Sequence, residues 1–127
     1  MIIGAGEGLN TSSSLFCNSI SEMVYLTKFF KGKEDTVYGL AGIGDLYVSA
    51  LGGRNSKMGE YLGQGMTFQE AKETKMPNIT VEGADLALEI GAKIKSDFSI
   101  EKLPLMTSVI DTICYGKPLS VKWKYFK

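Results

Sequence analysis

The sequence predicts an all-α domain on three grounds. Apolar residues recur at three- and four-residue spacing in several stretches, which is typical of helices that pack on a core. No stretch shows the alternation of apolar and polar residues that is typical of strands. The chain has 127 residues, 44% of them hydrophobic, which suits one globular domain with its own core. We therefore expect one compact domain of about six or seven helices.

The first expected element is a long helix that follows a short linker. Residues 1–9 are rich in glycine but lack the Gly-x-Gly-x-x-Gly spacing of a dinucleotide-binding loop, so we predict a linker there. Asn10 or Thr11 can cap a helix that runs to about Phe30, with Gly32 beyond its end. The apolar residues at helical spacing, which predict a core helix, are Phe16, Ile20, Met23, Val24 and Phe30.

Short helices are expected in the next part of the chain. Residues 34–41 begin with acids, which favour the N-terminal end of a helix. Residues 45–50 form a second helix, broken from the first by Gly42 and Gly44. Residues 56–62 form a third helix with one apolar face, and the glycines that follow close it.

The second half of the chain begins with a capping box. Thr67 and Glu70 satisfy each other's free backbone N–H groups and start a helix of about two turns, and Pro77 ends that region. Apolar periodicity then predicts a longer helix over about residues 81–95, followed by a polar break at residues 96–99.

The last predicted helix begins at Pro104, which suits a first helical turn, and ends before Gly116. Its apolar stripe is wide, which implies burial on more than one side, and it consists of Leu105, Met106, Val109, Ile110, Ile113 and Cys114. Residues 119–127 place three aromatic residues among lysines, and their pattern predicts no particular structure.

Charge and composition exclude several classes of function. The 14 basic residues equal the 14 acidic ones, so no overall field favours nucleic acid or an anionic membrane as a partner. Histidine is absent, and Cys17 and Cys114 are too far apart for a closely spaced metal site; we expect both to be reduced core residues. No secretory or membrane-spanning pattern is present, so a cytoplasmic location is expected.

Residues 39–55 are the stretch in which chemistry is most strongly indicated. Five glycines surround Asp45, which lies in an apolar run where a carboxylate is costly unless a partner satisfies it, and we expect this acid to be buried. Arg54 and Asn55 follow a Gly-Gly turn and precede a predicted helix. Backbone N–H groups, the helix dipole and a guanidinium group together predict a site for a small oxyanion, most plausibly phosphate.

Structural roles remain open for the same residues. Gly52 and Gly53 can form a simple turn between helices, with Arg54 solvated in the first turn. Asp45 can be a helix N-cap after Gly44, because aspartate favours that position whatever the function. Glu82, near the start of a helix, pairs well with the helix dipole.

The motifs together resemble the C-terminal domain of NAD(P)-dependent glycerol-3-phosphate dehydrogenases. Residues 40–49, Leu-Ala-Gly-Ile-Gly-Asp-Leu-Tyr-Val-Ser, and residues 52–55, Gly-Gly-Arg-Asn, are similar to the signature of that family. Further matches occur in the same order along nearly the whole chain: Asn10–Thr11 with Leu15–Phe16 and Ser21–Met23, Thr80–Ala84, and Leu103–Leu105 with Tyr115–Pro118. The resemblance implies the all-helical fold of 6-phosphogluconate dehydrogenase C-terminal domains over residues 10–127, with residues 1–9 a linker remnant.

The resemblance also implies roles for individual residues. Asp45 would help to position the reacting end of the substrate and orient the family's catalytic lysine, without acting as the base. Ser49, at a position where family members often have threonine, and Gly53, Arg54 and Asn55 would bind glycerol 3-phosphate or dihydroxyacetone phosphate. Arg54 would also reach the NAD or NADP cofactor, which Glu82 would contact at a family position that holds Glu or Gln.

The family's dinucleotide-binding Rossmann domain and its catalytic lysine precede this module, and no lysine of the present sequence matches that base. We therefore expect these 127 residues alone to be inactive. Three hypotheses follow. The first is that the chain is a substrate-binding fragment of such an enzyme of glycerol phosphate metabolism and phospholipid biosynthesis. The second is that it rebuilds an enzyme with a separate Rossmann polypeptide. The third is that it is a non-enzymatic helical association module, either a relic or a regulator, and a homo-oligomer is expected because members of the family dimerise.

Overall fold

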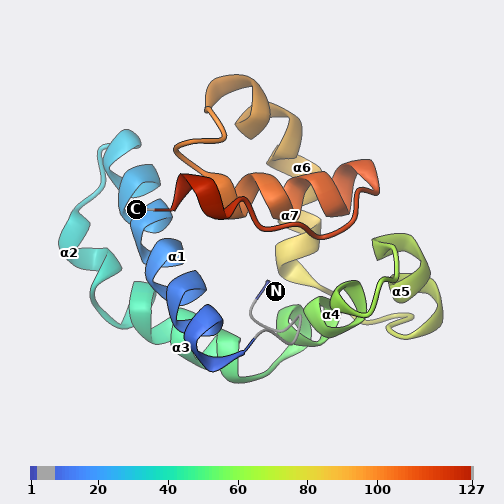
Figure 1. The fold of residues 1–127 in the computed structure, drawn as a ribbon. Helices are drawn as coiled ribbons and strands as arrows, with labels where there is room; N and C mark the ends of the chain where they lie inside the picture. Colours follow the sequence, from blue (N-terminus) through green and yellow to red (C-terminus); the bar gives the residue numbers. More distant parts are fainter. Residues whose placement is uncertain (3–7, 127) are drawn as a thin grey trace.

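The computed structural model describes residues 1–2 and 8–126, and the expected all-α fold is confirmed there (Figure 1). The elements in chain order are α1 (Leu9–Phe29), α2 (Glu34–Val37), the π-helix η2 (Leu40–Gly44), α3 (Asp45–Leu51), α4 (Arg54–Gly63), α5 (Phe68–Thr74), α6 (Glu82–Asp97), α7 (Pro104–Tyr115) and the 3-10 helix η3 (Trp123–Tyr125).

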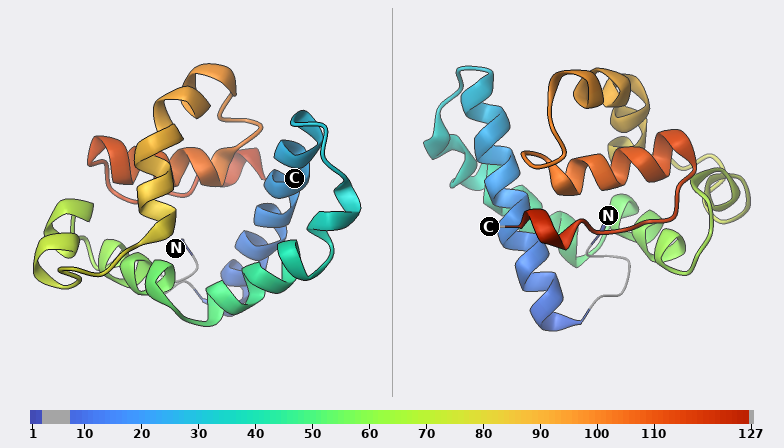
Figure 2. Two further views of the ribbon diagram at one scale, coloured as in Figure 1. Left: turned by 180° about the vertical axis from the view of Figure 1, so that it is seen from behind. Right: turned by 45° about the horizontal axis from the view of Figure 1, so that its top comes forward.

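Helix α7 lies across the middle of the molecule, and the other elements surround it (Figures 1 and 2). Helix α6 crosses α7 and packs against it, α1 contacts α7 on one side, and α4 packs against α6 and α5. The main core forms where these helices meet, and its fully buried side chains include Met58, Val81, Leu103 and Ile110. This arrangement leaves α2, η2 and α3 as a row of short helices beside α1.

The buried face of α1 differs from the predicted one. The structure buries Leu15, Asn18 and Glu22, whereas the predicted core residues are half-buried or, for Phe30, exposed. The reason is that Glu22 has hydrogen-bond partners inside the molecule, so a polar residue can take a core position. Cys17 is exposed, so its predicted place in the core is wrong; Cys114 is half-buried, and both thiols are free.

The predicted break at Gly42 and Gly44 is also wrong, because the chain there forms a π-helix that leads directly into α3. Gly44 N–H donates to the Gly39 carbonyl at 3.2 Å, which is the five-residue spacing of a π-helix. A β-carbon at Gly42 would lie only 2.0 Å from the carbonyl oxygen of Val37. Glycine at position 42 therefore allows the wide turn to pack closely on α2.

Some predicted helix ends agree with the structure and others do not. The predicted cap at Asn10 or Thr11 is wrong, because α1 begins at Leu9 with Gly8 as its N-cap, and the helix predicted over residues 34–41 ends at Val37.

The ends in the second half of the chain agree better. Glu70 N–H donates to the Thr67 hydroxyl at 3.1 Å, and Thr67 N–H donates to the Glu70 carboxylate at 2.9 Å, so the capping box is confirmed. Pro104 begins α7, and Gly116 ends it with a left-handed φ of 65°. Helix α6 extends to Asp97, into the predicted polar break.

Both ends of the described chain pack on the helices. Ile2 is buried with Leu15 and Leu105, and the segment after α7 runs back beside that helix to α1, where Val121 and Phe126 cover the same cluster (Figure 2). Residues 3–7 of the predicted linker lie outside the described residues. Over the described ranges, none of the helices combines the length and apolar character needed to cross a membrane.

Candidate functional site

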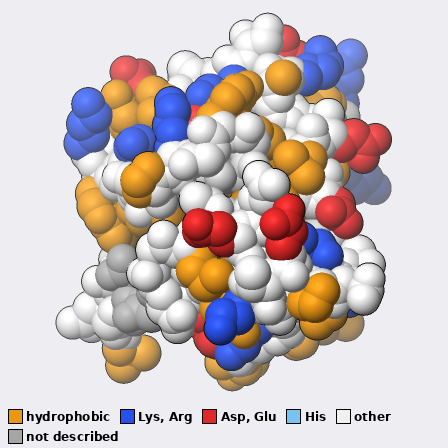
Figure 3. Space-filling view, turned by 90° about the vertical axis from the view of Figure 1, so that its right-hand side faces the viewer, with side chains coloured by type: hydrophobic (Ala, Val, Ile, Leu, Met, Phe, Trp, Pro, Cys, Tyr) orange, Lys and Arg blue, Asp and Glu red, His pale blue; other side chains and the backbone are white. Residues whose placement is uncertain are grey.

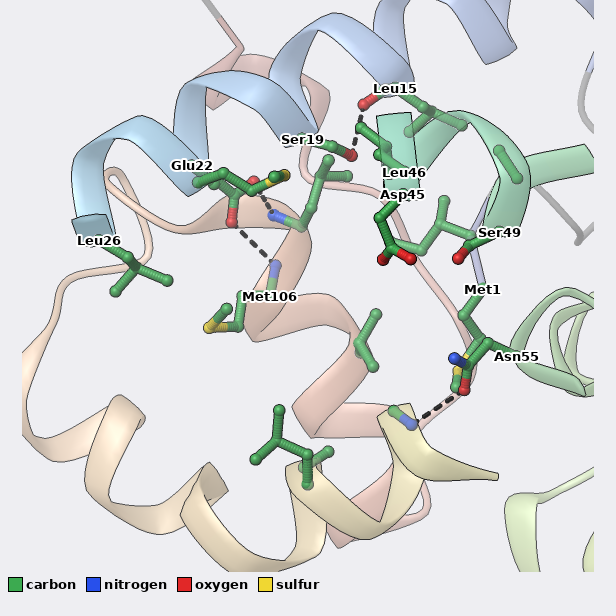
Figure 4. Close-up of a pocket in the computed structure, with 18 of the residues that line it drawn as sticks. Met1, Leu15, Ser19, Glu22, Leu26, Asp45, Leu46, Ser49, Asn55 and Met106 are labelled. Carbon is green, nitrogen blue, oxygen red and sulfur yellow. Dashed lines mark hydrogen bonds between the residues drawn. The ribbon is translucent and has the colours of Figure 1, made fainter. Parts of the chain in front are cut away.

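A cavity of about 440 Å³ lies between α1, α3, α6 and α7, and most of its wall is apolar (Figure 4). Leu26, Leu86, Ile90 and Met106 are among the apolar residues that line it. Polar groups are few, and they stand at separate points of the wall: Ser19, Glu22, Asp45, Ser49 and Asn55. Pockets of this kind, apolar with a few placed polar groups, are typical of small-molecule sites.

Asp45 and Ser49 lie on successive turns of α3, and their carboxylate and hydroxyl groups face the cavity (Figure 4). The four-residue spacing places both on one face of the helix. Asp45 is exposed, so its predicted burial is wrong: α3 contributes no buried residue, and water reaches its open side. The N-cap position of α3 belongs to Gly44, and Asp45 is the first residue of the helix rather than its cap.

Gly53 and Asn55 form the start of α4. Gly53 is its N-cap with a φ of 94°, a conformation that other residues rarely adopt, so glycine is needed to turn the chain there. The Asn55 side-chain oxygen accepts a hydrogen bond from Gly83 N–H at 2.9 Å. Because this bond occupies the oxygen, the Nδ2 amide of Asn55 is the group left to donate to a ligand in the cavity.

Arg54 pairs with Glu82 at the start of α6. Nη2 of Arg54 donates to Oε1 of Glu82, and the two side chains are 54% and 53% exposed. Arg54 is therefore an exposed residue in the first turn of α4, as the structural alternative predicted, and it is also paired with Glu82. The two neighbouring contacts, Arg54 to Glu82 and Asn55 to Gly83, join the N-terminal turns of α4 and α6.

The predicted site residues thus fall into two adjacent groups. Asp45, Ser49 and Asn55 line the cavity, whereas Gly53, Arg54 and Glu82 do not. Asn55 connects the groups, because it follows Arg54 in sequence and its partner Gly83 follows Glu82. The arrangement offers a small polyol an acceptor, a hydroxyl and an amide donor on one side and an apolar wall on the other, while Arg54, the residue before Asn55, lies outside this wall.

Glu22, like Ser19, is a polar residue of the wall for which the sequence pattern predicted no role. Its carboxylate accepts hydrogen bonds from the backbone N–H groups of Leu105 at 2.9 Å and Met106 at 3.0 Å, and from Asn18 Nδ2 at 2.8 Å. Glu22 is 6% exposed, and burial raises its pKa although all three hydrogen bonds act in the opposite direction. The signal in the sequence that could have identified Glu22 is an acidic residue inside an apolar helical pattern.

Outside the cavity, a patch of one charge or a metal site would indicate further chemistry. On the face shown in Figure 3, acidic and basic side chains are interspersed with apolar ones. Among residues 1–2 and 8–126, no group of three or more Cys, Asp or Glu side chains is placed to hold a metal ion. The candidate site is therefore the cavity with its neighbouring Arg54–Glu82 pair.

Comparisons with known proteins agree with the motifs. A family model described as "NAD-dependent glycerol-3-phosphate dehydrogenase C-terminus" matches residues 1–122. The chain is 35% identical over 121 residues to glycerol-3-phosphate dehydrogenase [NAD(P)+] of Agathobacter rectalis, covering 93% of this chain and 34% of that protein. It is 36% identical over 96 residues to the NADP(+)-dependent enzyme of Archaeoglobus fulgidus, covering 72% and 29% respectively. The chain thus spans about a third of the length of these relatives.

Proposed function

The chain belongs to the family formed by the C-terminal domain of NAD-dependent glycerol-3-phosphate dehydrogenases, and we propose that it is a substrate-binding domain for glycerol 3-phosphate or dihydroxyacetone phosphate. The observation that carries the proposal is the convergence of Asp45, Ser49 and Asn55 on one cavity beside Arg54. These residues come from two helices, and all lie in the stretch that matches the family signature.

In the proposed complex, Arg54 and the backbone N–H groups at the start of α4 bind the phosphate group. A guanidinium group binds phosphate through two parallel hydrogen bonds, and a helix N-terminus adds N–H donors and a favourable dipole. Asp45 and Ser49 then contact the oxygen atoms at the other end of the three-carbon skeleton. This fixes the reacting carbon in one orientation, which is the main contribution that a binding domain makes to catalysis.

Oxidation of the secondary alcohol group of glycerol 3-phosphate also needs a hydride acceptor and a base. The relatives are NAD(P)-dependent enzymes, and we propose that Arg54 and Glu82 contact NAD or NADP when a dinucleotide-binding domain holds it. No lysine of these 127 residues matches the family's base, so Asp45 would orient a lysine supplied from outside this sequence. The 127 residues alone are then a binding domain without turnover.

Titration of glycerol 3-phosphate into the chain tests this function directly. Chemical shifts of the backbone amides at residues 45–56 are the readout, and glycerol, which lacks the phosphate, is the control ligand. We expect saturable shifts with glycerol 3-phosphate and a dissociation constant at least about tenfold higher for Arg54→Ala, because a hydrogen bond to a charged group contributes about 1.5–3 kcal/mol. Equal affinity of both proteins would remove Arg54 from the site.

A second candidate function is self-association through an apolar surface. Leu40, Tyr47, Val48 and Leu51, on η2 and α3, are each more than half exposed. Exposed apolar side chains of this size favour contact with another protein surface, here a second copy of the chain. Small-angle scattering over a concentration series would show a dimer; a mass that stays monomeric at high concentration would contradict this function.

A further inference from the structure

The Arg54–Glu82 ion pair lies at the position proposed for phosphate binding, so an entering anion meets a guanidinium group that already has a partner. The guanidinium group has five N–H donors, and Glu82 accepts from Nη2. A phosphate that binds Arg54 with two parallel hydrogen bonds through the edge that includes Nη2 competes with the Glu82 carboxylate for that edge, since both are anions.

The geometry favours displacement. Both side chains are about half exposed, so the pair is solvated and holds together weakly. The backbone on both sides is anchored independently, because Asn55 accepts from Gly83 N–H at 2.9 Å. The Glu82 side chain can therefore swing away from Arg54 while the starts of α4 and α6 stay together.

We propose that Glu82 is an internal competitor for the anion site: its carboxylate occupies Arg54 in the free protein and is displaced when a phosphate monoester binds. This rests on the proposed function and adds a specificity role to the same site. A neutral ligand such as glycerol gains nothing from Arg54, whereas a phosphate dianion replaces the carboxylate with a stronger partner. Glu82 thus weakens the binding of every anion at Arg54, and anions that bind Arg54 less strongly than the Glu82 carboxylate are excluded.

The Glu82→Gln variant tests the proposal, because it keeps the size of the side chain and removes its charge. Glycerol 3-phosphate and inorganic phosphate are titrated at low ionic strength, where exposed charges are little screened. We expect dissociation constants about two- to fivefold lower than for the unmodified chain, as the value of an exposed ion pair predicts. Glycerol serves as the uncharged probe, and its binding should not change.

The matched control is Glu60→Gln. Glu60 pairs with Lys57 at 2.8 Å on the same helix as Arg54, with side chains that are 52% exposed for Lys57 and 45% exposed for Glu60. Both variants make the same change in net charge, so an effect of net charge alone would tighten phosphate binding equally in both. Local competition tightens it only in Glu82→Gln. An additional Arg54→Ala change should abolish the gain.

The outcomes separate this inference from the proposed function. If the unmodified chain binds glycerol 3-phosphate through Arg54 but Glu82→Gln binds no more tightly than Glu60→Gln, the competitor role is wrong and the binding function stands. Weaker binding by Glu82→Gln would mean that Glu82 supports the site, which also overturns the inference. If no variant binds glycerol 3-phosphate or phosphate, both proposals fall.

Discussion

At the scale of the residue, the five glycines of residues 39–55 differ in whether the structure requires glycine at that position. Gly42 is required by close packing, since a β-carbon would lie 2.0 Å from the Val37 oxygen, and Gly53 is required by its φ of 94°. Gly52 has a φ of 178°, an extended conformation that any residue adopts, and a β-carbon there would meet no atom of the described residues within 4 Å. The sequence pattern indicated the stretch but did not distinguish these cases.

This difference predicts the effect of alanine at two of these positions. Gly42→Ala should lower the free energy of unfolding by about 1–3 kcal/mol, because the new methyl group meets backbone that must shift. Gly52→Ala adds the same methyl group in open space and should change stability by less than about 0.5 kcal/mol. Urea denaturation of both variants checks this. Similar losses in the two proteins would contradict the packing argument.

Two acids show what could be inferred from single positions and what could not. Asp45 lines the cavity, yet its apolar neighbours wrongly suggested burial, because an apolar run does not reveal which side of a short helix is covered. Glu22 is buried because α7, more than 80 residues later, brings two N–H groups to it. Such a partner is visible only after folding.

The pKa of Glu22 predicts how stability depends on pH. Burial raises this pKa above its ordinary value of 4.5, so the folded chain holds the proton at a higher pH than the unfolded chain. The contribution of Glu22 to stability is therefore fully present below pH 4.5 and is lost as pH rises through the raised pKa, by at most about 1.4 kcal/mol per pH unit.

Glu22→Gln removes that ionisation and is the variant that checks the sign. Urea denaturation between pH 4 and pH 8 should show stability that falls less steeply with rising pH for Glu22→Gln than for the unmodified chain. The difference between the two curves isolates Glu22 from the other acids. Parallel curves would show that Glu22 ionises alike in the folded and unfolded states.

At the scale of the element, local signals predicted helix ends in the second half of the chain, but not the start of α1 or the end of α2. The caps and breakers near Thr67, Pro104 and Gly116 act on their own backbone, so four to six residues contain the information. The π-helix η2 escaped prediction because it depends on how closely residues 40–44 pack against α2, which is a tertiary contact. The core face of α1 was misassigned for the same reason, since its polar residues are satisfied by α7.

The capping box of α5 gives a prediction at this scale. Thr67→Ala removes the hydroxyl that accepts from Glu70 N–H and should lower the free energy of unfolding by about 1 kcal/mol. Thr74→Ala is the matched control, because that hydroxyl only donates back to the Glu70 carbonyl within the same helix. Urea denaturation should show a clearly smaller loss for Thr74→Ala; an equal or larger loss would contradict the capping role.

At the scale of the whole molecule, the family and the all-α class were predictable because motifs in a fixed order extend over nearly the whole chain. The cavity was not predictable, because its wall is assembled from α1, α3, α6 and α7. Local pattern identified Asp45, Ser49 and Asn55 as candidates, and only the packing of these helices shows that they share one space while Arg54 lies beside it.

The proposal that this chain binds substrate while another domain supplies the cofactor and the base predicts the result of an activity assay. With dihydroxyacetone phosphate and NADH, the 127 residues alone should show no oxidation of NADH, measured by absorbance. Addition of a separately produced dinucleotide-binding domain should give a complex on co-purification and measurable turnover. Turnover by the chain alone would refute the proposed role, and failure to form a complex would exclude assembly from two polypeptides.

The hydrogen bonds that Glu22 accepts from α7 join parts of the chain that a ribosome produces at very different times. Helix α1 is made before α7, so the Glu22 carboxylate lacks these two partners until the segment around Leu105 has been made. The cavity is therefore completed only once α7 exists, and a nascent chain interrupted before that point would carry Asp45 and Ser49 without the wall that faces them.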